Sequence, residues 1–95
     1  MKLTDLEQII ADRALLPNNE SYTSRLLTAG KVSVAKKIAE EGAEVALAIA
    51  AESADRVADE AADLIYHLLV GLHSRGLSMD DVKKVLASRH EGHSD

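Results

Sequence analysis

Apolar side chains recur at helical spacing along every long segment of the chain, and the alternating pattern typical of strands is absent. In the first segment, Leu6 and Ile10 lie one turn apart, and Thr4 with Glu7 has the spacing of a capping box. Pro17 ends this segment because proline cannot continue helical hydrogen bonding. The pattern predicts an all-α protein with five helices, at residues 4–16, 21–29, 33–51, 54–75 and 79–90.

Residue types that commonly cap helices lie at the predicted boundaries. Ser53 and Ser78 precede the fourth and fifth segments, and Asp81 has the capping-box position after Ser78. Gly30 and Gly76 follow the second and fourth segments, where helices often end on a glycine. With 95 residues, the chain is expected to form one domain over residues 1–90, followed by a frayed tail at 91–95.

The third predicted helix carries a carboxylate within its apolar stripe. At about 100° per residue, Glu41 falls inside the stripe, Glu44 lies further round, and Glu40 lies beyond Glu44. Burying an isolated carboxylate is costly, so Glu41 requires a cation, a proton or a polar partner. The stripe consists of Val34, Ile38, Val45 and Ile49.

The fourth predicted helix has a matching polar column, formed by Glu60, Asp63 and His67 along one border of its apolar stripe. A short connection makes the two helices antiparallel neighbours, so their carboxylates can meet. Carboxylates without thiolates suit a hard cation such as Mg²⁺ or Mn²⁺, and the Glu-x-x-His pattern of ferritin-like di-iron sites does not occur. The apolar stripe comprises Ala54, Val57, Ala58, Ala61, Leu64, Ile65, Leu68 and Leu72.

Charge and composition exclude several classes of function. The net charge is −5, aromatic residues make up 2% of the chain, and no basic run occurs, so nucleic-acid binding is not expected. No segment has the apolar length of a membrane span or the pattern of a signal peptide, so we expect a cytoplasmic protein without membrane partners.

The third helix also has a second apolar arc, on a different side from the stripe that holds Glu41. A helix that is apolar on most sides is buried on most sides, which one small subunit cannot achieve alone. We therefore expect a homodimer or a higher homo-oligomer. The arc consists of Ala43, Ala46, Leu47 and Ala50.

Three segments together resemble phosphoribosyl-ATP pyrophosphohydrolase, a family within the all-α nucleotide pyrophosphohydrolases. They are SYTSRLL at 21–27, KKIAEEGAE at 36–44 and DLIYHLLV at 63–70, and VLASR at 85–89 is also similar. The superfamily pattern is EExxE followed by ExxD on the next helix, which matches 40–44 and 60–63. The resemblance covers nearly the whole chain and implies an oligomeric subunit of four to five helices in a bundle-like arrangement.

The implied activity is the second step of histidine biosynthesis: phosphoribosyl-ATP diphosphatase, which hydrolyses phosphoribosyl-ATP to phosphoribosyl-AMP and pyrophosphate. Mg²⁺ is the implied cofactor, with Mn²⁺ as a substitute, and its ligands would be Glu41, Glu44, Glu60 and Asp63. Glu40 and Glu41 are the candidate catalytic residues. Glu40 would either ligate a second ion or act as general base toward water. The length suggests the stand-alone form rather than a fusion with the cyclohydrolase of the next step.

Eight further residues are candidates for contacts with phosphoribosyl-ATP. Most of them also have an ordinary structural alternative. Serine and threonine can cap a helix, the tyrosine can pack, and the lysines can form ion pairs with Glu40 or Glu41. The histidine can form a hydrogen bond with a carboxylate, and Arg89 can form a salt bridge. Tyr66 is expected to pack at an interface. The candidates are Ser21, Tyr22, Thr23, Arg25, Lys36, Lys37, His67 and Arg89.

Two other functions compete with this interpretation. The first is a house-cleaning nucleoside triphosphate pyrophosphatase of the same superfamily, which the segment at 21–23 and the pair Tyr66–His67 disfavour. The second is a non-catalytic helical oligomerisation module, which leaves the position of Glu41 unexplained. A comparison of phosphoribosyl-ATP with dNTPs as substrates separates the enzymes, and metal binding separates both from the module.

Overall fold

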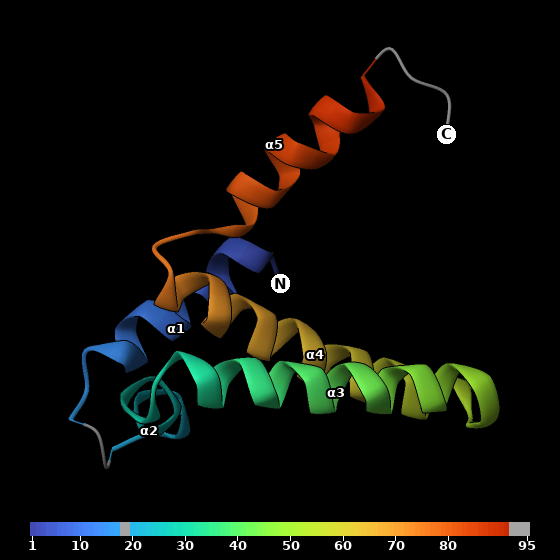
Figure 1. Ribbon diagram of the computed structural model, residues 1–95, viewed down its shortest axis with the longest axis horizontal. Helices are drawn as coiled ribbons and strands as arrows, with labels where there is room; N and C mark the ends of the chain where they lie inside the picture. The colour runs from blue at the N-terminus through green and yellow to red at the C-terminus, as the bar shows by residue number, and fades with distance from the viewer. Residues whose placement is uncertain (18–19, 92–95) are drawn as a thin grey trace.

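The structure, a computed structural model, describes residues 1–17 and 20–91. Within these ranges the chain forms five helices and no strand, which confirms the all-α prediction. Figure 1 shows α3 and α4 as a long antiparallel pair, with α1 and α2 at one end and α5 projecting away. The helices are α1 Leu3–Ala14, α2 Tyr22–Ala29, α3 Lys31–Ala51, α4 Ala54–Ser74 and α5 Met79–His90.

Local side-chain hydrogen bonds fix the starts of three helices. The hydroxyl of Ser21 accepts from the Ser24 N–H at 2.9 Å, and that of Ser53 accepts from the Arg56 N–H at 3.4 Å. At α5, the Asp81 carboxylate accepts from the Ser78 N–H at 2.8 Å. These contacts satisfy backbone donors that have no partner within a helix, as the sequence predicts for Ser53 and Ser78.

The end of α4 is a left-handed glycine turn. Gly76 has a φ of +72°, and its N–H donates to the His73 carbonyl at 3.0 Å. The N–H of Leu77 donates to the Leu72 carbonyl at 2.9 Å, which completes a Schellman motif. The predicted stop at Gly76 is confirmed, and this turn directs the chain toward α5.

The capping box predicted for the first helix is wrong. Lys2 is the last extended residue, so Asp5, not Glu7, has the third helical position, and it accepts from the Lys2 N–H at 3.0 Å. Glu7 instead accepts from the N–H of Met79 at 3.0 Å and so links α1 to the start of α5. The helix also ends at Ala14, two residues before the predicted end. The expected turn at residues 18–19 and the tail at 92–95 lie outside the described residues.

A small apolar core joins α1 to the α3–α4 pair. Ile10, Val34, Leu69 and Val70 are buried together where α1 meets the long helices. This packing joins the two long helices at the end where α2 leads into α3. Partly buried residues around this core are Leu6, Leu26, Leu27, Ile38, Tyr66, Leu72 and Met79.

The long helices pair through faces that differ from the predicted apolar stripes. On α4, Glu60 and His67 from the polar column are buried, whereas Ile65 and Leu68 are exposed. On α3, Ile49 was expected inside but is 67% exposed. The buried positions on α3 are Val34, Glu41 and Ala48, at intervals of seven residues. The side of α3 that faces α4 is therefore this narrow line and not the whole predicted stripe.

None of the helices within 1–17 and 20–91 has both the length and the apolar character that crossing a bilayer requires.

Candidate metal centre

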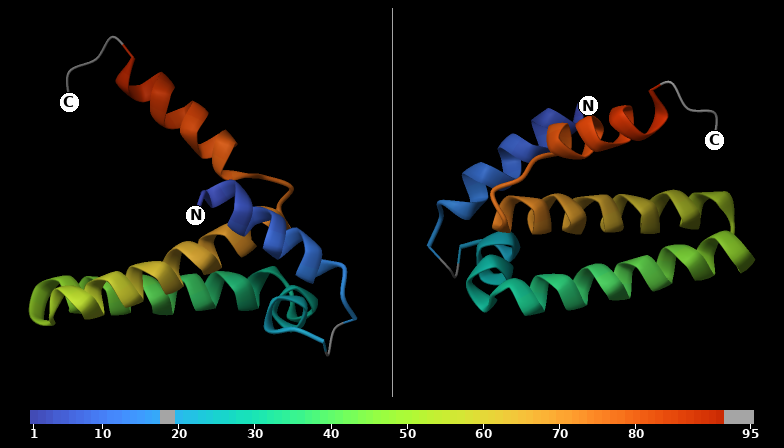
Figure 2. Two further views of the ribbon diagram at one scale, coloured as in Figure 1. Left: turned by 180° about the vertical axis from the view of Figure 1, so that it is seen from behind. Right: turned by 45° about the horizontal axis from the view of Figure 1, so that its top comes forward.

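Three carboxylates from the two long helices meet inside the α3–α4 pair. One oxygen each from Glu41, Glu60 and Asp63 forms a group in which all atoms lie within 4.8 Å of one another. Glu41 is 5% exposed and Glu60 is 8% exposed, while Asp63 faces solvent. Figure 2 shows the two helices side by side along their length. The structure thus brings together three of the four metal ligands predicted from the sequence.

Two oxygens of this group have no hydrogen-bond partner. They are Glu41 Oε2 and Glu60 Oε2, both fully shielded from solvent by the described residues. A buried charged oxygen without a partner costs free energy because it loses its water and gains nothing in exchange. A hard divalent cation supplies that missing partner, and the donor set of carboxylate oxygens is the type that Mg²⁺ prefers. The residues present therefore fit such an ion.

Glu44 lies at the edge of the same group. The pKa of Glu44 is raised above its ordinary value of 4.5. The main cause is a side-chain hydrogen bond with Glu60, and the negative charges of Glu41 and Glu60 add to it. Its proximity to both carboxylates agrees with the predicted fourth ligand, although Glu44 is outside the tightest group. Glu40 is exposed, and the group of three does not include it.

Two basic side chains compensate the buried carboxylates. Lys37 Nζ lies 3.2 Å from Glu41 Oε1, and this contact raises the pKa of Lys37. Arg56 Nη2 lies 2.5 Å from Glu60 Oε1. The ion pair weighed for Lys37 is therefore present, whereas Lys36 is exposed. Sequence reasoning missed Arg56, although its spacing four residues before Glu60 was a signal for the pair.

A chain of hydrogen bonds connects α2 to α4. The Nδ1–H of His67 donates to the Asp63 carbonyl oxygen at 2.7 Å, because that oxygen can only accept. In the neutral ring, Nε2 then accepts from the hydroxyl of Tyr22 at 2.8 Å. The expected carboxylate partner of His67 is therefore wrong, since the partner is a backbone carbonyl. The chain joins Tyr22 to the backbone of a predicted ligand.

The other candidates on α2 have structural contacts. Thr23 is 1% exposed and its hydroxyl bonds to that of Tyr66, which also accepts from Arg13 at 3.2 Å. The capping role considered for Thr23 does not match these contacts. Ser21 caps α2 as expected. These bonds tie α1, α2 and α4 together beside the carboxylates.

The two remaining candidates, both arginines, lie on the surface. Arg25 is exposed on α2. Arg89 is exposed in the last turn of α5, the helix that projects from the body. Within one chain, neither is part of the carboxylate group.

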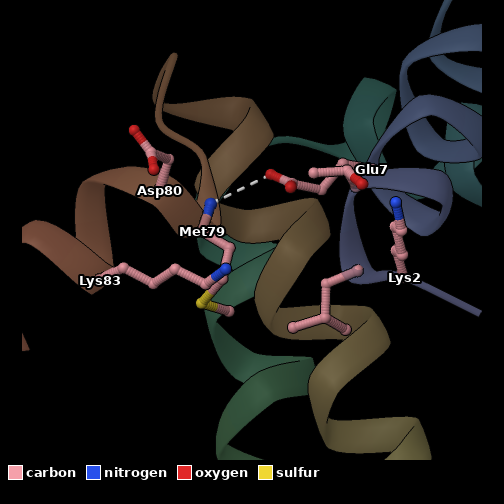
Figure 3. Close-up of a pocket in the computed structure, with 7 residues that line it drawn as sticks. Lys2, Glu7, Met79, Asp80 and Lys83 are labelled. Carbon is pink, nitrogen blue, oxygen red and sulfur yellow. Dashed lines mark hydrogen bonds between the residues drawn. The ribbon is translucent and has the colours of Figure 1, made fainter.

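A separate cavity of about 290 Å³ lies between the starts of α1 and α5 (Figure 3). Lys2 and Glu7 line it from α1, and Met79, Asp80 and Lys83 line it from α5. None of the site residues predicted from the sequence lines this cavity. It marks the junction that the Glu7–Met79 hydrogen bond holds.

Comparisons with known proteins identify the family of the chain. The family described as phosphoribosyl-ATP pyrophosphohydrolase matches residues 3–90. A phosphoribosyl-ATP pyrophosphatase from Pyrobaculum arsenaticum is 48% identical over 89 residues, which cover 94% of this chain and 95% of that protein. A protein of the same name from Rhizobium meliloti is 42% identical, over 92% of this chain and 81% of that protein.

A longer relative contains a similar segment. The histidine biosynthesis bifunctional protein HisIE from Vibrio cholerae is 45% identical over 94% of this chain, which corresponds to 42% of that protein. The family match and the identities extend over nearly all the residues that build the five described helices. The chain therefore belongs to the phosphoribosyl-ATP pyrophosphohydrolase family.

Proposed function

We propose that this protein hydrolyses phosphoribosyl-ATP to phosphoribosyl-AMP and pyrophosphate, the second step of histidine biosynthesis. The observation that carries the proposal is the group of Glu41, Glu60 and Asp63, of which the two glutamates are buried, in a chain whose family match spans residues 3–90. A phosphoanhydride substrate brings negative charge, which this acidic site can accept only together with cations. The domain boundary at residue 90 and the cytoplasmic location remain predictions.

The proposed cofactor is a divalent cation, Mg²⁺ or in its place Mn²⁺, held by Glu41, Glu44, Glu60 and Asp63. Such an ion neutralises charge on the phosphate oxygens of a bound substrate. The unpartnered buried oxygens of Glu41 and Glu60 support this role, because each lacks the positive partner that a buried carboxylate needs. Burial of these two side chains also keeps bulk water from competing for the ligand oxygens.

Glu40 and Glu41 are the proposed catalytic residues. Glu41 contributes a ligand oxygen from inside the α3–α4 pair, while Glu40, at the preceding position of α3, is exposed. An exposed carboxylate beside the site can accept a proton from an attacking water or bind a second ion. The first role predicts that Glu40→Gln lowers kcat without weakening Mn²⁺ binding.

The proposed substrate contacts lie mainly at the α2 end of the site. Tyr22 and His67 face one another there, and Lys37 pairs with Glu41 on the same side. Their hydroxyl, ring and ammonium groups suit a phosphoribosyl moiety with its phosphate. The remaining proposed contacts are Ser21, Thr23, Arg25, Lys36 and Arg89.

We also propose a homo-oligomer. The apolar residues that face outward from α3 and α4, with Leu47 65% exposed, support an interface between copies of the chain. Such an assembly would bring surface residues such as Arg89 near the site of another subunit.

A substrate panel tests the proposed function. Purified protein is incubated with phosphoribosyl-ATP or with each dNTP, with and without Mg²⁺, and released pyrophosphate and the nucleotide product are measured. We expect phosphoribosyl-AMP and pyrophosphate from phosphoribosyl-ATP only when Mg²⁺ is present. Preferential hydrolysis of dNTPs would instead assign the chain a house-cleaning activity. If no substrate is hydrolysed, either with or without Mg²⁺, the result would support the oligomerisation module.

A further inference from the structure

Two cations bracket the carboxylate group along the α3–α4 pair. Lys37 lies one turn before Glu41 on α3, and Arg56 lies one turn before Glu60 on α4. The two helices lie side by side (Figure 2) and run antiparallel, so these two positions lie on opposite sides of the carboxylate group. Lys37 is on the side of α2, and Arg56 is on the side of the α3–α4 connection. A substrate with several phosphates therefore meets a cation at each end of the acidic site.

Arg56 has three carboxylate partners within its own region of the chain. Its guanidinium lies 2.5 Å from Glu60, 3.4 Å from Glu52 and 3.9 Å from Asp59. The Arg56 side chain is 54% exposed, whereas the side chain of Glu60 is 10% exposed. The guanidinium thus stands at the solvent boundary of the site, between one buried carboxylate and two surface carboxylates.

Only one of these partners belongs to the candidate metal centre. Glu60 uses Oε1 for Arg56, while its Oε2 is buried without a partner. A divalent cation bound by Glu60 places like charge next to the guanidinium and weakens the Arg56–Glu60 attraction. Glu52 and Asp59 still tether Arg56 near the site, but exposed ion pairs of this kind are weak. The guanidinium is then available to an incoming anion.

We propose that Arg56 binds a phosphate group of the triphosphate substrate at the α3–α4 connection end of the site, and that Glu60 holds it in place until a cation and substrate arrive. The inference rests on the proposed function. A guanidinium presents two parallel N–H groups that match phosphate oxygens, so one arginine can both orient and neutralise a phosphate. Because Arg56 lies at the opposite end of the site from Lys37, it would contact the phosphate that is furthest from α2.

The test measures phosphate binding separately from turnover. Protein loaded with Mn²⁺ is titrated with inorganic pyrophosphate by calorimetry, for wild type, Arg56→Gln and Arg56→Lys. Lys84→Gln is the matched control, because Lys84 forms a similar pair with Asp80 at 3.3 Å on α5. Mn²⁺ affinity without pyrophosphate is measured for each variant, as are KM and kcat for phosphoribosyl-ATP.

We expect Arg56→Gln to weaken pyrophosphate binding and raise KM by about 10- to 100-fold, the range for lost hydrogen bonds to a charged group. Arg56→Lys should recover part of this loss, Lys84→Gln should match wild type, and Mn²⁺ affinity should not fall. Unchanged pyrophosphate affinity and KM in Arg56→Gln, or a loss of Mn²⁺ affinity by the same factor, would overturn the inference. If the wild type itself releases no pyrophosphate from phosphoribosyl-ATP, the proposed function fails instead.

Discussion

At the residue scale, the site is defined by carboxylates whose surroundings do not balance their charge. Glu41 and Glu60 are buried, and one oxygen of each lies within 4.8 Å of the other. Lys37 pairs with one oxygen of Glu41, and Arg56 pairs with one oxygen of Glu60. The second oxygen of both carboxylates is unpartnered. A side-chain hydrogen bond with Glu60 and the negative charges of Glu41 and Glu60 raise the pKa of Glu44. Such an arrangement is unfavourable without a further cation, which links the electrostatics of the site to its proposed cofactor.

Titration of Glu44 provides a direct check of this electrostatic picture. In metal-free protein, carboxyl NMR should give Glu44 a pKa above its ordinary value of 4.5, because Glu60 and Glu41 disfavour its charged form. The raised pKa means that Glu44 favours the folded state below pH 4.5 and that this contribution is lost as the pH rises through the raised value.

The variant Glu60→Gln should lower the pKa of Glu44, since it removes the largest cause of the shift. Glu52→Gln serves as the control, because Glu52 contacts Arg56 and does not contribute to the shift. A Glu44 pKa that does not respond to Glu60→Gln would show that the two carboxyl groups are not neighbours in solution.

At the scale of helices, local signals were predictable and long-range contacts were not. The caps at Ser53 and Ser78 and the stop at Gly76 depend on residues within one turn, so sequence spacing sufficed to predict them. Glu7 instead bonds to an amide 72 positions away, which no local pattern reveals. The predicted start of α1 was wrong because the position of a cap depends on the backbone dihedral angles of a single residue. Lys2, not Thr4, is the last extended residue before the helix.

The inner face of α4 shows why an apolar stripe does not by itself identify the buried side. Helical spacing indicated the polar column of Glu60, Asp63 and His67, and the structure buries two of its members, Glu60 and His67. The stripe next to it keeps Ile65 and Leu68 exposed within one chain. Periodicity therefore located the carboxylates, but only tertiary packing could show which face pairs. Arg56 was missed since an exposed i,i+4 pair is common on helix surfaces.

The hydroxyl pair of Thr23 and Tyr66 is a link between helices that mutation can test. Tyr66→Phe leaves the fully buried hydroxyl of Thr23 without its partner, so we expect a loss of about 1–3 kcal/mol in the free energy of unfolding. Adding Thr23→Val removes the unsatisfied group, and the double variant should be more stable than Tyr66→Phe alone. Urea unfolding of wild type, Tyr66→Phe and the double variant measures both effects. Equal stability of Tyr66→Phe and wild type would contradict the role of this bond.

At the scale of the whole molecule, one chain leaves much apolar surface uncovered. Leu47 and Ile49 on α3 are 65% and 67% exposed, and the body has only a small core where α1 meets the long helices. A chain of 95 residues buries a limited share of its surface, so association is a common route to stability. The second apolar arc of α3 was already evident in the sequence, and its exposure in a single subunit is consistent with the proposed interface.

Assembly can be tested by placing a charge in this arc. Leu47→Glu should lower the average mass in sedimentation equilibrium, because a carboxylate would be buried in the proposed interface. The position is mostly exposed in one chain, so the helical content should be retained. Thr28→Glu, at an exposed polar position on α2, is the control and should sediment like wild type. A wild type that is monomeric at all concentrations would contradict the proposed oligomer.

The most direct test of the account measures Mg²⁺-dependent pyrophosphate release from phosphoribosyl-ATP by wild type, Glu41→Gln and Asp63→Asn. Each variant keeps the shape of its side chain but removes a carboxylate from the group of three. We expect each to lower kcat/KM by at least about 100-fold, since a metal ligand contributes several kcal/mol to transition-state stabilisation, while the helical content is retained. Full Mg²⁺-dependent turnover in both variants would contradict the assignment of these carboxylates as the metal centre.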